Sequence, residues 1–190
     1  MEELKLRKVI AYEYVTLDGV MEAPEKWQFP YFSDDFAEFN KAQILSFGAS
    51  LPGRVTYEIF ASYWPLQTNN EIGLADKINS APKFVLSSSL QKAEWNNSTL
   101  IKDGKNLSEE INKLKQQPGG DIGIIGNATL VQSLMQADLI DEVQLLVHPI
   151  VVGSGKRLFK DGTDLTALKL IETKTFDSGV IFLRDQPDRK

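Results

Sequence analysis

Strand-type and helix-type segments alternate along most of this chain, and their order limits the fold more than any other feature of the sequence. Runs of β-branched and aromatic residues predict strands, while apolar residues spaced three or four apart predict helices. The predicted strands are residues 7–15, 49–51, 83–86, 99–102, 121–125 and 142–147, and the predicted helices are 34–47, 56–64, 72–78, 107–117 and 128–137. Alternation of this kind is typical of a parallel sheet, because parallel neighbours need helical crossovers.

The last part of the chain changes character, because strand segments follow one another directly. Residues 168–176 and 180–184 flank Asp177-Ser178-Gly179, a turn sequence typical of a β-hairpin. The sequence therefore predicts an α/β fold in three layers. Helices cover both faces of a mostly parallel, mixed sheet, and an antiparallel hairpin forms its C-terminal edge. Ser33, before the helix at 34–47, and Asn106 with Glu109, at the helix 107–117, predict helix caps.

Composition narrows the class of protein. The chain has 190 residues, no cysteine, one histidine and a formal net charge of −5. Disulfides, zinc–thiolate sites and multi-histidine metal sites are excluded, so no metal site is predicted. No block of lysine and arginine stands out, which argues against nucleic acid as the main partner. The sequence has no long apolar run, so neither a signal peptide nor a membrane span is predicted. We expect one domain over residues 1–190, in the cytoplasm.

Three predicted strand ends are followed by residues that favour phosphate binding. Glycine lets the backbone approach a ligand closely, and N–H groups at a helix N-terminus attract anions. Each junction alone is also typical of a turn or cap, and the spacing differs from the GxGxxG fingerprint. Because strand ends share one rim in open α/β sheets, the three together predict a site for an extended ligand with several phosphates. They comprise Gly53, Arg54, Val55 and Thr56; Ser87, Ser88 and Ser89; and Gly126, Asn127, Ala128 and Thr129.

The order of these motifs resembles the dihydrofolate-reductase-like family. The matching segments are Thr-Leu-Asp-Gly at 16–19, Gly-Arg-x-Thr-Tyr-Glu at 53–58, Val-Leu-Ser-Ser-Ser-Leu at 85–90 and Gly-x-Ala-x-Leu at 126–130. The later run His-Pro-Ile-Val-Val-Gly-Ser-Gly-Lys-Arg-Leu-Phe at 148–159 resembles the riboflavin-biosynthesis branch of that family. This branch is the C-terminal reductase domain of the bifunctional deaminase-reductase RibD. The resemblance covers residues 7–184, and the zinc-dependent deaminase half of RibD has no counterpart here.

The resemblance implies a reductase that uses NADPH. Arg54 would bind the 2′-phosphate of the adenosine, and Thr56 with the following helix N-terminus would bind the pyrophosphate. Ser87 and Ser88, with Ser89 in the same loop, would border the adenosine. The residues from 126 to 129 would hold the pyrophosphate from the other side. Anchors remote from the reacting carbon fix a hydride donor against its acceptor.

Substrate contacts are expected from residues 16–39 and from the glycine-rich loop after residue 152. Asp35 lies about where dihydrofolate reductase keeps its substrate-binding carboxylate, and Asp18 would lie near the nicotinamide, so these are the candidate catalytic residues. The open alternatives are a helix-start acid for Asp35 and a turn former for Asp18. His148 is expected to be structural. The candidate substrate-binding residues are Thr16, Trp27, Gly153, Gly155, Lys156 and Arg157.

Two functional hypotheses stay open. The first is an NADPH-dependent reductase of a small heterocyclic substrate. Its type reaction is reduction of 5-amino-6-(5-phosphoribosylamino)uracil, and dihydrofolate reduction is a less favoured variant. The second is a non-catalytic NADPH-binding sensor that kept the fold without the substrate site. The edge offered by the C-terminal hairpin, together with the resemblance, also predicts a homodimer.

Overall fold

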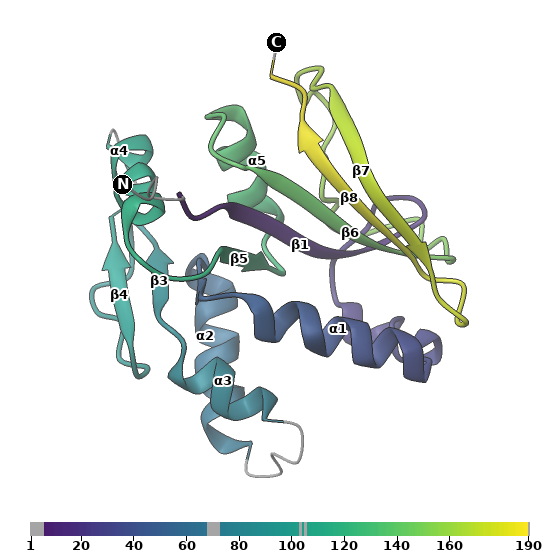
Figure 1. The fold of residues 1–190 in the computed structure, drawn as a ribbon, viewed down its shortest axis with the longest axis horizontal. Helices are drawn as coiled ribbons and strands as arrows, with labels where there is room; N and C mark the ends of the chain where they lie inside the picture. The colour runs from purple at the N-terminus through teal and green to yellow at the C-terminus, as the bar shows by residue number, and fades with distance from the viewer. Residues whose placement is uncertain (1–5, 68–72, 103, 105, 190) are drawn as a thin grey trace, which may run out of the picture.

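One mixed sheet organises the molecule, as the computed structural model of residues 6–67, 73–102, 104 and 106–189 shows. Its order is β4-β3-β2-β5-β1-β6-β8-β7 (Figure 1). The strands are β1 Val9–Thr16, β2 Ala49–Ser50, β3 Lys83–Leu86, β4 Ser98–Ile101, β5 Ile122–Ile125, β6 Glu142–His148, β7 Leu168–Thr175 and β8 Ile181–Pro187. The helices are α1 Asp34–Ser46, α2 Arg54–Tyr63, α3 Leu74–Ser80, α4 Leu107–Gln116 and α5 Ala128–Gln136, with short 3₁₀ turns at η1 Pro24–Lys26, η2 Phe29–Tyr31 and η3 Trp64–Leu66.

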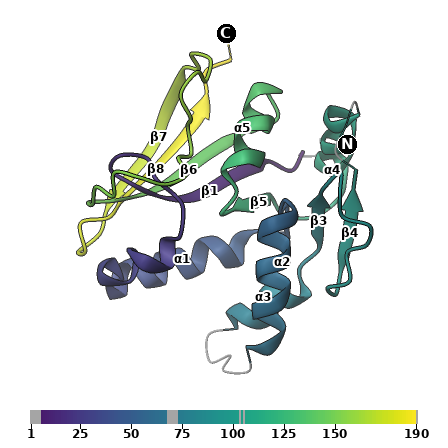
Figure 2. The ribbon, with the colours of Figure 1, turned by 180° about the vertical axis from the view of Figure 1, so that it is seen from behind.

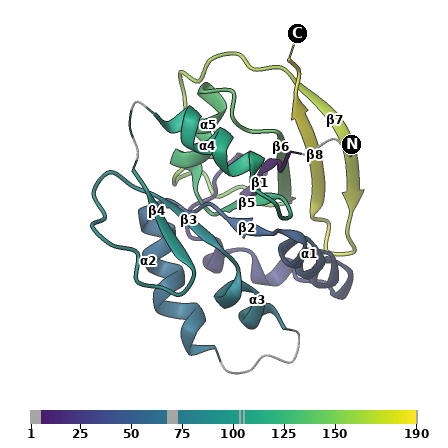
Figure 3. The same ribbon diagram turned by 60° about the vertical axis from the view of Figure 1, so that its left-hand side comes forward.

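The strand pairing confirms the predicted mixture of directions. β1 runs parallel to β5 on one side and to β6 on the other, with Val9 opposite Ile122 and Ile10 opposite Glu142. β2, β3 and β4 continue the parallel part. β8 and β7 add antiparallel to β6, where Leu146 lies opposite Phe182. The hairpin therefore forms the edge of an otherwise parallel sheet, and Figure 3 shows β8 and β7 at that edge.

Helices cover both faces of the sheet, so the fold has the three predicted layers (Figures 1 and 2). On one face α4 and α5 pack Ile111 and Val131 into a large aliphatic core. On the other face α1 packs Phe36 into a smaller, aromatic core with Tyr12 and Phe182. The helices α2 and α3 lie on the same side of the sheet as α1 (Figure 1). Among the described helices, none has the length and apolar character needed to cross a membrane.

The capping of α1 and α4 and the first residue of α2 differ from the sequence-based expectations. The Ser33 hydroxyl donates to Asp35 Oδ1 at 2.6 Å instead of accepting a backbone N–H of α1. Asn106 makes no side-chain cap, so the predicted capping box is wrong; Glu109 instead pairs with Lys113, one turn on, at 2.8 Å. The predicted helix at 56–64 begins earlier, at Arg54. The short helix predicted over 72–78 is α3, and residue 72 lies outside the described part of the chain.

Candidate active site

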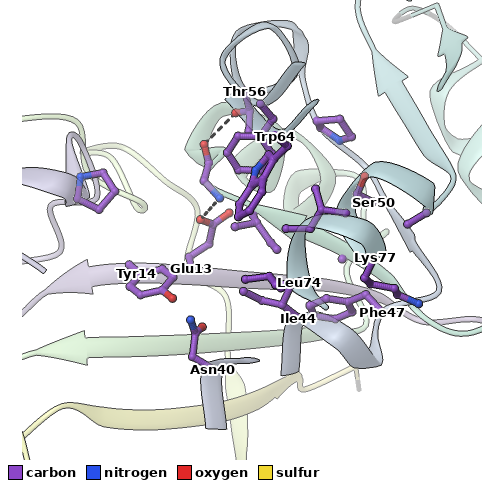
Figure 4. A pocket seen from close by; sticks show the side chains of 18 of the residues that line it. Glu13, Tyr14, Asn40, Ile44, Phe47, Ser50, Thr56, Trp64, Leu74 and Lys77 are labelled. Carbon is purple, nitrogen blue, oxygen red and sulfur yellow. Dashed lines mark hydrogen bonds between the residues drawn. The ribbon is translucent and has the colours of Figure 1, made fainter. Parts of the chain in front are cut away.

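The chain leaves the neighbouring strands β1 and β5 in opposite directions. β1 leads through α1 to β2 on one side, and β5 leads through α5 to β6 on the other. Such a reversal opens a crevice beyond the carboxyl ends of the two strands. β5 ends at Ile125, which lies opposite Tyr12, whereas β1 continues to Thr16. The second half of β1 therefore borders the crevice and presents Glu13 and Tyr14 to it (Figure 4).

Glu13 is a fully buried carboxyl group at this crevice. Its Oε2 accepts the backbone N–H of Gly126 at 2.7 Å, and its Oε1 accepts that of Asn127 at 3.1 Å. Burial raises the pKa of Glu13 to about 8, because the loss of hydration outweighs the two N–H bonds that favour the charged form. Glu13 therefore keeps its proton at neutral pH, and its two hydrogen bonds join β1 to the turn that follows β5.

A cavity of about 430 Å³ lies beside Glu13, between the sheet and the helices α1, α2 and α3. We call it the apolar cavity. Only Glu13 and Lys77 are charged among the described residues that line it, and their charged ends point away from each other in Figure 4. Tyr14 and Asn40 add a hydroxyl and an amide that face one another. The wall is otherwise mainly aromatic and aliphatic, with Met21, Phe32, Ile44, Phe47, Phe60, Trp64, Leu74, Ile78, Trp95 and Ile125.

A second cavity, of about 770 Å³, brings the three predicted junctions together. We call it the junction cavity. All eleven predicted cofactor-binding residues line it, together with Lys156 from the glycine-rich loop. Lys156 Nζ donates to Thr129 Oγ1, in the first turn of α5, at 2.7 Å. Arg54 is half-exposed in the first turn of α2 and lies 3.3 Å from Glu58. Two cations, Arg54 and Lys156, and two helix N-termini meet around this cavity, and Glu22 and Glu25 also lie on its wall. The cations and the N-terminal N–H groups are the part of the wall suited to phosphate.

The two cavities share part of their walls, which are Met21, Pro24, Thr56, Phe60 and Gly126. Thr56 Oγ1 donates to the backbone oxygen of Gly126 at 3.0 Å, so the first turn of α2 is fixed to the turn after β5 (Figure 4). Gly53 approaches the same turn so closely that a Cβ there would lie 2.4 Å from Asn127 Nδ2. Asn127 in turn caps α5 by accepting the N–H of Leu130. A ligand that extends from the junction cavity along this wall reaches Glu13.

The second group of predicted residues lies in a turn-to-loop contact outside the two cavities. Asp18 Oδ1 accepts from Thr16 Oγ1 at 2.6 Å, and Asp18 Oδ2 accepts from the N–H of Gly153 at 2.8 Å. These bonds lower the pKa of Asp18 to about 2. Arg157 Nε donates to the Asp18 backbone oxygen at 3.1 Å. The walls of the apolar cavity and the junction cavity include none of Thr16, Asp18, Gly153, Gly155 and Arg157.

Asp35 and Trp27 are likewise absent from the cavity walls. Asp35 accepts from Ser33 Oγ and from the N–H groups of Phe36 and Asp177, so its carboxylate joins the start of α1 to the C-terminal hairpin. The hydrogen bond from Ser33 is the main cause that lowers the pKa of Asp35, and the two backbone N–H bonds lower it further. Trp27 is buried with its ring centre 5.0 Å from that of His148, edge to face. The roles assigned to both from the sequence stay predictions.

Sequence reasoning missed the residues that give the apolar cavity its character. Glu13 carried the one available signal: a carboxylate within the β-favouring run Val-Ile-Ala-Tyr-Glu-Tyr-Val-Thr at 9–16, where glutamate is rarely buried without partners. Asn40 and Lys77 sit on ordinary helical faces, and Trp64 and Trp95 look like core residues. These residues come together only because α1, α2, α3 and the loop before β4 pack around one cavity. Local sequence patterns do not predict such packing.

Comparison with solved structures identifies the fold class of the chain. The fold is that of dihydrofolate reductase: the enzyme from Enterococcus faecalis, complexed with NADP(H), superimposes with a TM-score of 0.63 at 14% identity over 96% of this chain and 97% of its own. A protein from Shewanella sp. PV-4 whose name places it in riboflavin biosynthesis gives a TM-score of 0.74 at 18% identity, over 96% and 99% of the two chains. At these identities the likeness shows the fold alone.

Sequence similarity then gives the family. The family model for the RibD C-terminal domain matches residues 7–182, so the chain belongs to this family. An uncharacterized protein of Bacillus subtilis strain 168, YyaP, is 34% identical in an alignment of 183 positions that covers 94% of each chain. The predicted family is thereby confirmed.

Proposed function

We propose that this chain is an NADPH-dependent reductase of a small heterocyclic substrate. The observation that carries the proposal is the meeting of two unlike cavities at Thr56 and Gly126: one is suited to phosphates, and the other is apolar with a buried acid. A reductase needs this division, because the cofactor must be held remotely while its reactive ring faces the substrate. Membership of the RibD C-terminal domain family supports the same function.

The residues of the junction cavity fit NADPH. Arg54 would hold the 2′-phosphate with its planar fork, and Ser87 to Ser89 would border the adenosine. The α5 N-terminus at Ala128 and Thr129, together with Lys156, would hold the pyrophosphate. When bound, NADPH would supply a hydride at its nicotinamide ring. The protein would position that ring at the shared wall, next to Glu13.

Direct nucleotide binding tests this function. We expect calorimetry to show NADPH binding with higher affinity than NADH, because only NADPH carries the 2′-phosphate that Arg54 would bind. NADPH oxidation is then followed with 5-amino-6-(5-phosphoribosylamino)uracil, dihydrofolate and uncharged ring compounds as acceptors. Turnover of any of them supports a reductase. Tight NADPH binding without turnover of any acceptor would favour the non-catalytic sensor, and a protein that binds neither nucleotide would rule out both functions.

We further propose a single-domain, cytoplasmic homodimer. β7 is the sheet edge, and almost every residue of this strand is exposed, including Leu170 at 54% and Ile171 at 41%. An exposed edge with apolar side chains is suited to pairing across a two-fold axis. Light scattering after size-exclusion chromatography should give twice the chain mass of 21.3 kDa. Leu170→Lys should shift the mass toward the monomer, and a monomeric wild-type protein would contradict the proposal.

A further inference from the structure

Tyr14 is the only residue of β1 that is partly exposed, and the other residues of this strand are buried. Side chains alternate between the two faces of a sheet, so Tyr12 and Tyr14 point to the face that α1 covers. Tyr14 lines the apolar cavity, and its hydroxyl group faces Asn40 of α1 (Figure 4). Because Glu13 is completely buried, Tyr14 is the side chain of β1 that a ligand in this cavity can touch.

Asn40 determines which hydrogen bond the Tyr14 hydroxyl group can make. Asn40 is buried, and its side-chain oxygen accepts from the hydroxyl group of Tyr12 at 2.8 Å. Its NH₂ group is therefore the part that faces Tyr14, and it donates to the Tyr14 oxygen. An NH₂ group cannot accept, so the Tyr14 hydroxyl group keeps its own proton for another partner. No residue in the described part of the chain accepts that proton.

Aromatic neighbours hold the ring of Tyr14 in place. Its centre lies 6.2 Å from the ring centres of Tyr12 and Phe36, both in edge-to-face contact, and 5.7 Å from that of His148. Burial raises the pKa of Tyr14 by more than the hydrogen bond from Asn40 lowers it, so the hydroxyl group stays protonated at neutral pH. The mainly apolar wall therefore presents one fixed, uncharged hydrogen-bond donor at this place.

We propose that Tyr14 is a specificity-determining hydrogen-bond donor of the apolar cavity, and that the ligand is a largely apolar ring compound with a carbonyl oxygen that accepts this bond. The inference rests on the proposed reductase function where it takes this ligand to be the substrate. The cavity volume of about 430 Å³ falls in the range of small-molecule sites. The side chains of Phe47, Trp64 and Trp95 line the cavity, and flat rings pack well against such groups.

The unused proton of Tyr14 makes the cavity discriminate between ligands of the same shape. A ligand without an acceptor would strip water from the hydroxyl group and leave it unpaired, which is unfavourable. A ligand with a carbonyl oxygen beside Tyr14 would restore the bond. Ser50 and Lys77 also line the cavity, but they lie well apart from Tyr14 in Figure 4. The acceptor of the ligand is therefore expected at the β1–α1 side.

Two probes that differ in one acceptor test this donor role. 1-Tetralone and tetralin have nearly the same fused-ring shape, and only 1-tetralone carries a carbonyl oxygen. Calorimetry measures the binding of each probe to wild type and to Tyr14→Phe, which removes the hydroxyl group and keeps the ring. Comparing the two proteins for one probe cancels the different hydration of the probes in water. Tyr14→Phe should weaken 1-tetralone about 3- to 10-fold and leave tetralin within about 2-fold or bind it more tightly.

The other outcomes contradict the inference. Equal losses of both probes would show that Tyr14 acts through packing alone, and a wild-type protein that binds neither probe would overturn the ligand class. NADPH is titrated separately into both proteins, and its affinity should be the same in Tyr14→Phe. A wild-type protein that binds 1-tetralone but not NADPH would contradict the proposed function and leave the donor role of Tyr14 standing.

Two control variants test whether the effect belongs to Tyr14. Gln28 is another polar residue that lines the apolar cavity, and Gln28→Met removes its donor while keeping its length. Tyr63 of α2 is exposed and is not among the residues that line the cavity, and Tyr63→Phe removes a hydroxyl group there. Both variants should bind each probe within about 2-fold of wild type. A selective loss of 1-tetralone in Gln28→Met would assign the donor role to Gln28 and overturn the inference.

The location is tested by filling the cavity. Ile44 of α1 lines the apolar cavity, whereas Ala42 of the same helix is exposed and lies outside it. Ile44→Trp should weaken the binding of both probes more than about 10-fold and leave NADPH binding unchanged. Ala42→Trp is the matched control and should change neither. A 1-tetralone affinity that survives Ile44→Trp in the folded protein would overturn the placement.

Discussion

Glu13→Gln should remove a pH dependence from the stability of this protein. Burial raises the pKa of Glu13 from its ordinary 4.5 to about 8, so the folded protein keeps this proton in a pH range where the unfolded chain has lost it. Between these values unfolding releases a proton, and a higher pH therefore favours unfolding. The contribution of Glu13 to the unfolding free energy is complete below about pH 4.5 and is lost as the pH rises through about 8, a change on the order of 4–5 kcal/mol.

Urea unfolding of the wild type and of Glu13→Gln from pH 4.5 to pH 8.5 measures this effect. The wild-type free energy minus that of the variant should fall with rising pH, because glutamine does not titrate. Other groups, including buried His148, titrate in both proteins and cancel in the difference. Glutamine also places an NH₂ group against one of the two backbone N–H donors, which lowers stability at every pH. Parallel curves would show that Glu13 is ionised in the folded protein throughout.

Arg54→Ala should weaken NADPH binding about 10- to 100-fold and leave NADH binding within about 2-fold of wild type. The reason is that a 2′-phosphate contact through a guanidinium is charge-assisted and exists only for NADPH. Arg54 is half-exposed and its pair with Glu58 is a surface ion pair, so its removal should change stability little. Calorimetry with both nucleotides gives the ratio of affinities directly.

Glu58→Gln is the matched control for Arg54→Ala. It removes the ion-pair partner, which lies 3.3 Å from Arg54, and leaves the guanidinium in place. NADPH affinity should stay the same or rise, because the competing carboxylate is gone. Equal losses of NADPH and NADH in Arg54→Ala would contradict the 2′-phosphate role and point to a general disturbance of the α2 N-terminus.

Most of the fold was predictable from local pattern. Side-chain periodicity indicates which segments are strands and which are helices. Near the C-terminus two strand segments follow each other without a helix, and this predicted where the antiparallel edge of the sheet lies. The bounds differ by up to three residues, because the ends of an element depend on which backbone groups find partners: α2 begins at Arg54, directly after Gly53, and β8 continues to Pro187. The three phosphate-friendly junctions were also predictable, since the carboxyl ends of parallel strands share one rim.

The candidate substrate site was not predictable to the same degree. Asp18 and Asp35 are carboxylates that could bind or protonate a substrate. In the structure they instead accept hydrogen bonds from the backbone N–H groups of Gly153 and Asp177. Glu13 has the same chemistry and faces a cavity, because β5 stops at Ile125 while β1 continues beside it. Which carboxylate borders the cavity is decided by strand lengths and crossovers, not by spacing along the chain.

The sequence by itself therefore determined the α/β class and the family, and it predicted a set of residues for a cofactor with phosphates. These properties follow from local periodicity, glycine and hydroxyl residues at strand ends, and the order of motifs. Only the tertiary structure decided that Glu13 is buried against Gly126 and Asn127, 113 and 114 residues away, and that it borders an apolar cavity. Desolvation and non-local hydrogen bonds set the pKa of this group, and both depend on packing between distant elements.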